Sequence, residues 1–227
     1  MKEIIYKAKK KIYIYNTLNN KKELFIPINY NNIGMYVCGP TLYKNVHLGN
    51  CRTFIFFDIL YRYFKHLNFN IKYIRNITDI NYNFKNDIDN KYYTYMYKIK
   101  KFYLKYNKIL NIFNLLSPNL EPRTTNHIIE QIENIKKIIK FKFAYKNNGS
   151  IYFDIEKYNK YIGDYGKILN KININNKFKN KNYFSNEKKN FFDFVIWKNL
   201  NNIKMIKWKS LWSPGIPGWH IGCTTIS

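Results

Sequence analysis

The sequence predicts an α/β fold in which a helix connects two parallel strands. Residues 34–38 (GMYVC) form an apolar run suited to a buried parallel strand. Residues 51–67 carry apolar side chains on more than one helical face, which predicts a largely buried helix. Residues 70–75 (NIKYIR) alternate apolar and polar side chains, as a strand does. Strand, glycine-containing loop, helix and strand in this order form a βαβ unit.

Further elements are expected on both sides of this unit. Residues 12–15 and 24–28 are predicted to be short strands, joined by the polar turn NTLNNKKE. After the unit, residues 89–114 and 123–141 are predicted to be mainly helical.

The second half of the chain contains a Lys/Asn-rich stretch at residues 170–190. Its few apolar side chains cannot offset the entropy of ordering it, so we expect a solvated loop or an insertion. Ordered structure is expected to resume at residues 191–197 (FFDFVIW) and to lead into a Gly- and Pro-rich stretch at residues 213–227.

The composition is strongly basic, with 39 Lys and Arg against 14 Asp and Glu and a formal net charge of +25. Such a surplus favours polyanions such as RNA. The abundance of Lys, Asn, Ile and Tyr equally fits the codon bias of an AT-rich genome, so charge alone leaves both explanations open.

Several protein classes are excluded by the same composition. No apolar run approaches the ~18 residues that cross a bilayer, and the N-terminus has no signal-peptide pattern, so no membrane partner is expected. Three cysteines do not form a disulfide framework and fit a reducing compartment.

A candidate nucleotide site follows the first strand of the unit. His47, Leu48, Gly49 and Asn50 lead into the helix, whose N-terminus offers N–H groups and partial positive charge to phosphate. Gly49 lets a nucleotide lie against the backbone, and His47 can donate a hydrogen bond to phosphate oxygens. On its own, HLGN is more often an ordinary loop.

Residues 36–58, YVCGPTLYKNVHLGNCRTFIFFD, closely resemble the signature of the class I cysteinyl-tRNA synthetases, whose "HIGH" element stands here as HLGN. The resemblance covers nearly the whole chain apart from the Lys/Asn-rich stretch. The further matching blocks, in the family's order, are IYNTLNNKKELFIPI, YIRNITDI (73–80), LLSPNLEPRTTNHIIEQIE (115–133), DFVIWK (193–198) and PGWHIGC (217–223).

The resemblance implies a Rossmann-like nucleotide-binding fold with an inserted connective α+β segment. We expect residues 1–118 to form the first half of the catalytic domain, residues 119–205 the connective insertion, and residues 206–227 a return into the catalytic domain.

The resemblance also implies a zinc ion that binds the substrate thiolate, since zinc prefers sulfur ligands. Cys38 and Cys223 match the two cysteine ligands, whereas Cys51 is expected only to pack. The expected cysteine-binding residues are Gly39, Thr41, Thr78 and Trp219. Packing in the core is an equally good interpretation of Trp219.

The same resemblance implies that ATP, with Mg, is the second substrate. His47 and Asn50 are the expected catalytic residues, because they would stabilise charge on the transferring phosphate. The expected ATP-binding residues are Pro40, Thr41, His47, Leu48, Gly49 and Asn50.

The sequence departs from the family at the zinc site and at the nucleotide site, where several of the family's functional residues are missing. The zinc-binding His and Glu and the "KMSKS" loop lie beyond Cys223 in the family. Gly222 stands where the family usually has Glu, and Asn50 replaces the second His of "HIGH". We therefore expect an N-terminal part of the catalytic domain with an incomplete zinc ligand set.

Three functions remain open at this point. The first is a cysteine–tRNA ligase, acting on L-cysteine, ATP and tRNA(Cys) with a separately encoded C-terminal half, in the cytoplasm of an AT-rich reduced bacterium or an organelle. The second is a catalytically inactive remnant or RNA-binding module of the same family. The third, the least favoured, is a relative that joins cysteine to an amino-sugar.

Overall fold

The computed structural model describes residues 11–82, 92–163, 165–166 and 187–227. The chain divides into two compact units, residues 1–126 with 226–227, and residues 127–225. Each unit has its own hydrophobic core. In the described residues, no helix is both long and apolar enough to span a membrane.

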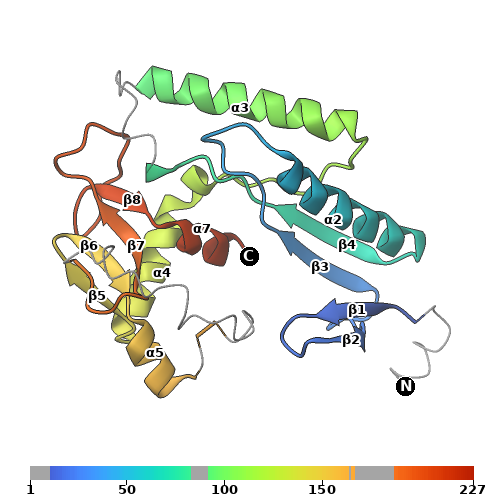
Figure 1. Cartoon of the computed structure of the whole chain (residues 1–227), viewed down its shortest axis with the longest axis horizontal. Coiled ribbons are helices and arrows are strands. Elements are labelled where there is room, and N and C mark those ends of the chain that lie inside the picture. The colour runs from blue at the N-terminus through green and yellow to red at the C-terminus, as the bar shows by residue number, and fades with distance from the viewer. Residues whose placement is uncertain (1–10, 83–91, 164, 167–186) are drawn as a thin grey trace. The chain divides into compact units, whose positions relative to one another are not determined.

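The first unit contains the predicted βαβ arrangement (Figure 1). Strands β3 (Asn32–Val37) and β4 (Asn70–Arg75) pair in parallel, and α2 (Leu48–His66) connects them. The prediction of a parallel strand–helix–strand unit is confirmed. The helix begins three residues earlier than predicted, so Leu48, Gly49 and Asn50 belong to its first turn and not to the preceding loop.

A third extended segment lies beside β4, on the edge away from β3. Leu120 and Arg123 form parallel bridges with Ile74 and Ile77. The amide of Arg75 donates to Leu120 O at 3.1 Å. Strand β4 is therefore central, whereas β3 has only β4 as a strand partner among the described residues.

Helix α2 packs one face onto these strands and leaves the other open. Its buried side chains are Cys51, Phe54, Asp58, Tyr61 and Phe64. This spacing of three or four residues marks a single face. The opposite face exposes Phe56 by 60% and Ile59 by 62%. The prediction of a largely buried helix is wrong here, because the described unit covers only one side of it.

The N-terminal hairpin extends the same core. Strands β1 (Tyr13–Asn16) and β2 (Lys21–Leu24) pair antiparallel, so the second strand lies earlier than the predicted 24–28. The chain reverses at residues 17–20, where Asn20 has a φ of 54°. Asn tolerates this left-handed conformation, so the turn closes before the apolar run begins.

Helix α3 (Tyr92–Ile112) lies within the predicted 89–114, of which residues 89–91 are outside the described residues. The predicted helix over 123–141 is divided into a 3₁₀ turn, η2 (Thr124–His127), and α4 (Ile128–Lys140). The turn forms because Thr125 bonds to Asp79 through both its amide and its hydroxyl.

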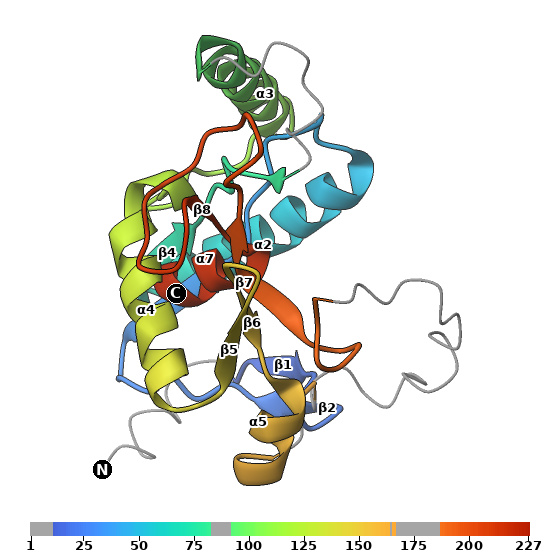
Figure 2. The same cartoon turned by 90° about the vertical axis from the view of Figure 1, so that its left-hand side faces the viewer.

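The second unit is a four-stranded antiparallel sheet with helices (Figure 2). The strands pair in the order β5 (Ala144–Asn147), β6 (Ser150–Phe153), β7 (Phe194–Asn199) and β8 (Gly215–Pro217). Helices α4, α5 (Ile155–Tyr161) and α7 (Trp219–Ile226) belong to the same unit.

The core of this unit forms where α4 and α7 meet the sheet. Its buried side chains are Ile135, Ile151, Ile196, Trp197 and Ile221. Most of the predicted loop 170–190 lies outside the described residues, and residues 187–190 form turns. The second unit is thus an α+β segment that spans residues 127–225.

Candidate functional site

The expected site residues of the first unit gather where parallel strands end. Cys38 directly follows β3, and its side chain is exposed. Thr41 then forms a parallel bridge with Thr78, beyond the end of β4. The amide of Leu42 donates to Thr78 O at 2.9 Å, and the amide of Thr78 donates to Pro40 O at 3.0 Å. The carboxyl ends of parallel strands are where α/β proteins bind ligands.

Gly39 is required by the closeness of the two strand ends. Its amide donates to Asn76 Oδ1 at 3.0 Å. A Cβ atom on residue 39 would lie 1.7 Å from the carbonyl oxygen of Asn76. Any side chain here would push the two segments apart, so the glycine sets the position of Cys38 relative to Asn76.

Thr78 is held by the same asparagine. Asn76 Nδ2 donates to Thr78 Oγ1 at 3.3 Å, and both side chains are buried. The hydroxyl of Thr78 therefore has a fixed direction next to the Pro40–Leu42 segment. The structure thus brings together Cys38, Gly39, Pro40, Thr41 and Thr78.

His47 forms the N-cap of α2, with φ −115° and ψ 170°. Its amide donates to Asn50 Oδ1 at 3.2 Å, and its carbonyl accepts from the amide of Asn50 at 2.9 Å. The first N–H groups of a helix have no carbonyl within the helix to bond to. The first turn of α2 carries no acidic residue, so its electrostatic potential favours an anion.

Gly49 lies within this first turn, and the structure gives a local reason for it. A Cβ atom on residue 49 would lie 3.1 Å from Cε1 and Nδ1 of His47. The glycine therefore leaves room for the His47 imidazole beside the helix N-terminus. Leu48, between them, has an exposed side chain.

Two polar groups that the sequence analysis did not single out support the strand ends. The Arg75 side chain is 1% exposed, and its Nη2 lies 3.1 Å from Glu121 Oε1. Glu121 Oε1 also accepts from Tyr106 Oη at 2.9 Å. The ion pair between the buried Arg75 and the half-buried Glu121 joins β4 to the segment before η2, and the Tyr106 hydroxyl joins this pair to α3.

Asp79 is the second such group. Its carboxylate accepts from the amide and hydroxyl of Thr125, at 3.0 and 2.7 Å. Burial raises the pKa of Asp79, and these two hydrogen bonds and the nearby charge of Arg123 oppose the shift. In the sequence, the polar residues of NITD (76–79) directly after a predicted strand are the pattern that could have indicated Asn76 and Asp79.

The remaining expected residues belong to the second unit. Gly218 precedes α7, and a Cβ atom there would lie 2.1 Å from Val195 O. Trp219 begins α7 and is 63% exposed, so packing in the core is the wrong interpretation of this residue. Cys223 is half-buried. It follows Trp219 by four residues, which places both on neighbouring positions of one helix face.

All three cysteines are free thiols, and Cys51 is buried in α2, as expected for packing. Among the described residues, no three His, Cys, Asp or Glu side chains gather into a metal-binding group. Thiolates are good zinc ligands, so the chemistry of Cys38 and Cys223 fits this metal, but two donors fall short of the usual four.

Comparison with known proteins identifies relatives along nearly the whole chain. Residues 24–227 match the family model for the class I (C) tRNA synthetase catalytic domain. A cysteine–tRNA ligase of Bacteroides thetaiotaomicron is 42% identical over 94% of this chain and 45% of its own length. The ligase of Wigglesworthia glossinidia brevipalpis is 43% identical over 94% of this chain and 46% of its own length.

The chain thus spans about half the length of the curated relatives that it matches. Among solved structures, a protein from Campylobacter jejuni described as an arginyl-tRNA synthetase is 12% identical, with a TM-score of 0.43. That match covers 63% of this chain and 44% of the other, and so low a score does not establish a shared fold.

Proposed function

Because the chain belongs to the family of class I (C) tRNA synthetase catalytic domains, we propose that it takes part in cysteine–tRNA ligation. The cysteine carboxylate attacks the α-phosphorus of ATP, pyrophosphate leaves, and cysteinyl-adenylate forms. A terminal ribose hydroxyl of tRNA(Cys) then attacks the acyl carbon, and AMP leaves. Neither step needs a protein nucleophile, so positioning and charge stabilisation carry the catalysis.

One observation carries the proposal more than any other. Cys38, Gly39 and Thr41 lie beyond the carboxyl end of β3, on the loop that leads to α2. Gly39 bonds to Asn76, and Thr41 pairs with Thr78. An amino acid held by this loop would have its carboxylate near a helix N-terminus suited to phosphate. The chain is 42% identical to a cysteine–tRNA ligase over the region that contains these residues.

We assign the site residues as follows. His47 and the first turn of α2, with Asn50, stabilise the phosphates of ATP, whose Mg ion is brought with the nucleotide. Pro40, Thr41, Leu48 and Gly49 line the nucleotide. Gly39, Thr41, Thr78 and Trp219 bind cysteine, and the exposure of Trp219 makes its indole available to a ligand.

Cys38 and Cys223 are proposed as the protein thiolates that would hold zinc, with further ligands supplied from outside this sequence. When bound, zinc would bind the substrate thiolate in preference to a serine hydroxyl. The exposure of Cys38 and the position of Cys223 beside Trp219 support this assignment.

The reaction is proposed to need the remaining part of the synthetase, on the same or on a separate polypeptide. Two surfaces support this requirement. The first is the edge of strand β3 away from β4, because among the described residues β4 is the strand partner on one side only. Parallel sheets are rarely this small, so a further strand is expected at this edge. The outer face of α2 exposes Phe56 and Ile59, which a further packed element would cover.

The residues are further proposed to follow the predicted organisation, with a catalytic half, residues 119–205 as connective insertion and a return at residue 206. The observed division into units falls at residues 126 and 127, and residues 206–225 are part of the second unit. The free thiols support a reducing compartment. We propose the cytoplasm of a reduced bacterium or an organelle.

The test is ATP–pyrophosphate exchange with the chain and the remaining part of the synthetase combined. The proposal predicts exchange that depends on cysteine and is at least about a hundredfold slower with serine. No cysteine-dependent exchange in the combined enzyme would favour the alternative of an inactive remnant or RNA-binding module. Transfer of the cysteinyl group to an amino-sugar but not to tRNA would favour the third function.

A further inference from the structure

We infer that one exposed face of helix α3 binds RNA through phosphate and base contacts. This basic–aromatic face comprises Tyr93, Tyr97, Lys100, Lys101 and Lys108. The identity of the RNA as a tRNA rests on the proposed function, whereas the assignment of the face rests on the structure of the helix.

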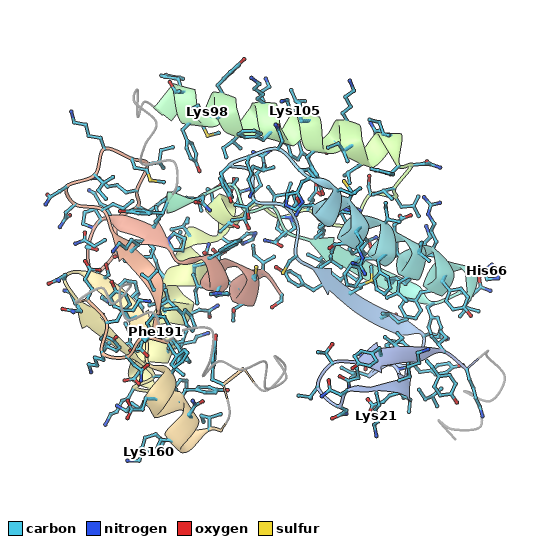
Figure 3. All side chains as sticks on the ribbon, in the orientation of Figure 1. Lys21, His66, Lys98, Lys105, Lys160 and Phe191 are labelled. Carbon is cyan, nitrogen blue, oxygen red and sulfur yellow. The ribbon has the colours of Figure 1, made fainter. Side chains whose placement is uncertain are left out.

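The face lies opposite the side by which α3 packs in its unit. The buried side chains are Tyr95, Ile99, Tyr106 and Leu110, at intervals of four, seven and four residues. With 3.6 residues per turn, the residues of the basic–aromatic face fall on the other side of the helix. Figure 3 shows side chains standing away from α3, with Lys98 and Lys105 labelled along its length.

Helix α3 itself carries no acidic residue that would oppose the charge of its lysines. Its 21 residues include five lysines and neither Asp nor Glu. In the described part of the chain, Lys100, Lys101 and Lys108 form no ion pair, whereas Lys136 lies 2.6 Å from Glu133 on α4. Lysines that lack acidic neighbours keep their full attraction for phosphate.

The aromatic side chains add a contact that a merely solvated lysine face would lack. Tyr93 is 83% exposed and Tyr97 is 67% exposed. They lie four residues apart, so their rings are neighbours on the helix surface. Exposed rings among lysines are the combination by which proteins stack bases and neutralise the backbone of single-stranded RNA.

The arrangement favours RNA over a membrane surface. A helix that binds a membrane presents a continuous apolar face to the lipid. The continuous apolar face of α3 is already buried in its own unit. On the exposed side, Tyr97, Lys101, Leu104 and Lys108 alternate at intervals of four, three and four residues, so lysines interrupt any apolar stripe.

Helix α3 is attached beside the proposed nucleotide loop by its packed side and the adjoining flank, and the basic–aromatic face points away from these contacts. Lys105 Nζ donates to Asn45 Oδ1 at 3.1 Å. Asn45 precedes His47 by two residues, and Phe54 of α2 contacts Tyr106 of α3 ring to ring at 5.6 Å. The helix that carries the face is therefore fixed to the loop at which the acyl group is proposed to form.

The test compares two triple variants of the whole chain that lose equal charge. Lys100→Glu, Lys101→Glu and Lys108→Glu alter the face, and Lys22→Glu, Lys65→Glu and Lys72→Glu alter exposed lysines elsewhere in the same unit. Binding of a tRNA(Cys) transcript is followed by fluorescence anisotropy over a range of KCl concentrations. Circular dichroism confirms that both variants are folded.

We expect the face variant to bind RNA at least about tenfold more weakly, with a salt slope shallower by about 2. The control variant should change affinity by less than about threefold. The double variant Tyr93→Ala, Tyr97→Ala should weaken binding by about tenfold without changing the salt slope, because stacking carries no charge.

Equal loss of affinity in the two triple variants would overturn the inference, since it would reduce the effect to net charge. Binding of the wild type to phosphatidylserine vesicles that is lost in the face variant, with RNA binding unchanged, would overturn it in favour of a membrane. Cysteine-dependent pyrophosphate exchange is measured in parallel, without RNA, after each variant is combined with the remaining part of the synthetase. If exchange is absent from the wild type and every variant, the proposed function is contradicted. A loss of RNA binding confined to the face variants would still support RNA binding by the basic–aromatic face.

Discussion

The amide of Gly39 donates to the side-chain oxygen of Asn76 at 3.0 Å, across the carboxyl ends of two parallel strands. The contact is possible because residue 39 has no side chain. It fixes Cys38 and Thr41 beside Thr78, and thereby shapes the part of the site that is proposed to hold cysteine.

Gly39→Ala should destabilise the protein by about 3 kcal/mol, because a methyl group would collide with the backbone carbonyl of Asn76. Thermal and urea unfolding measure the change. Gly34→Ala on β3 is the matched control, since a Cβ atom there has no heavy atom within 4 Å. It should alter stability by less than about 1 kcal/mol. Equal losses in both variants would show that the close approach is not what the glycine provides.

Glu121→Ala should destabilise the protein by about 3 kcal/mol, because it leaves the charge of Arg75 buried without its partner. The control is Glu133→Ala, which removes an exposed partner of Lys136 and should cost less than about 1 kcal/mol. Urea unfolding compares the two. A loss for Glu121→Ala as small as that of the control would mean that Arg75 does not depend on this carboxylate.

Asp79→Asn should change the pH dependence of stability. Burial raises the pKa of Asp79 in the folded state, so the folded protein retains this proton to higher pH than the unfolded chain. The stability due to Asp79 is therefore greatest below its unfolded pKa of about 3.9 and falls as pH rises through the folded value. Asp79→Asn cannot lose a proton at this position, so its stability lacks this decrease with rising pH.

The measurement is the melting temperature of wild type and Asp79→Asn between pH 3.5 and 7. Lost hydrogen bonding to Thr125 adds an offset that does not depend on pH. The difference, variant minus wild type, should rise with pH. A constant difference, or one that falls with pH, would contradict a raised pKa.

His47→Ala should slow cysteine-dependent pyrophosphate exchange by about a hundredfold in the combined enzyme, because a donor to the transferring phosphate is lost. Stability should change by less than about 1 kcal/mol, since His47 contributes mainly through its backbone to the cap of α2. His66→Ala, in the last turn of the same helix, is the control and should keep the wild-type rate. Equal exchange rates in the wild type, His47→Ala and His66→Ala would show that His47 does not contribute to the reaction.

The sequence predicted the elements that local patterns determine. The apolar run before Cys38 and the alternation in NIKYIR identified two strands, and the structure confirms their parallel pairing. The second strand of the hairpin begins earlier in the chain than predicted, because Asn20 adopts a left-handed conformation that closes the turn before the apolar residues. Similarly, no pattern in 123–141 shows that Thr125 bonds to Asp79 and interrupts the helix.

The site residues were predicted by resemblance, and their supporting contacts were not. Gly39 was expected to bind cysteine, and the structure shows in addition that it contacts Asn76, 37 residues away. The partnership of Arg75 with Glu121 likewise joins positions 46 residues apart. Such pairs depend on which strand ends meet, so only the folded chain reveals them.

The proposal that Cys38 and Cys223 bind one zinc ion is tested most directly by the metal content of the combined enzyme. Zinc is measured by mass spectrometry after gel filtration of the wild type, Cys38→Ser and Cys51→Ala, the last altering only a packed thiol. We expect about one zinc per wild-type enzyme and per Cys51→Ala enzyme, and a content near zero in Cys38→Ser. A full zinc content in Cys38→Ser, together with wild-type cysteine-dependent exchange, would contradict the proposed cysteine site.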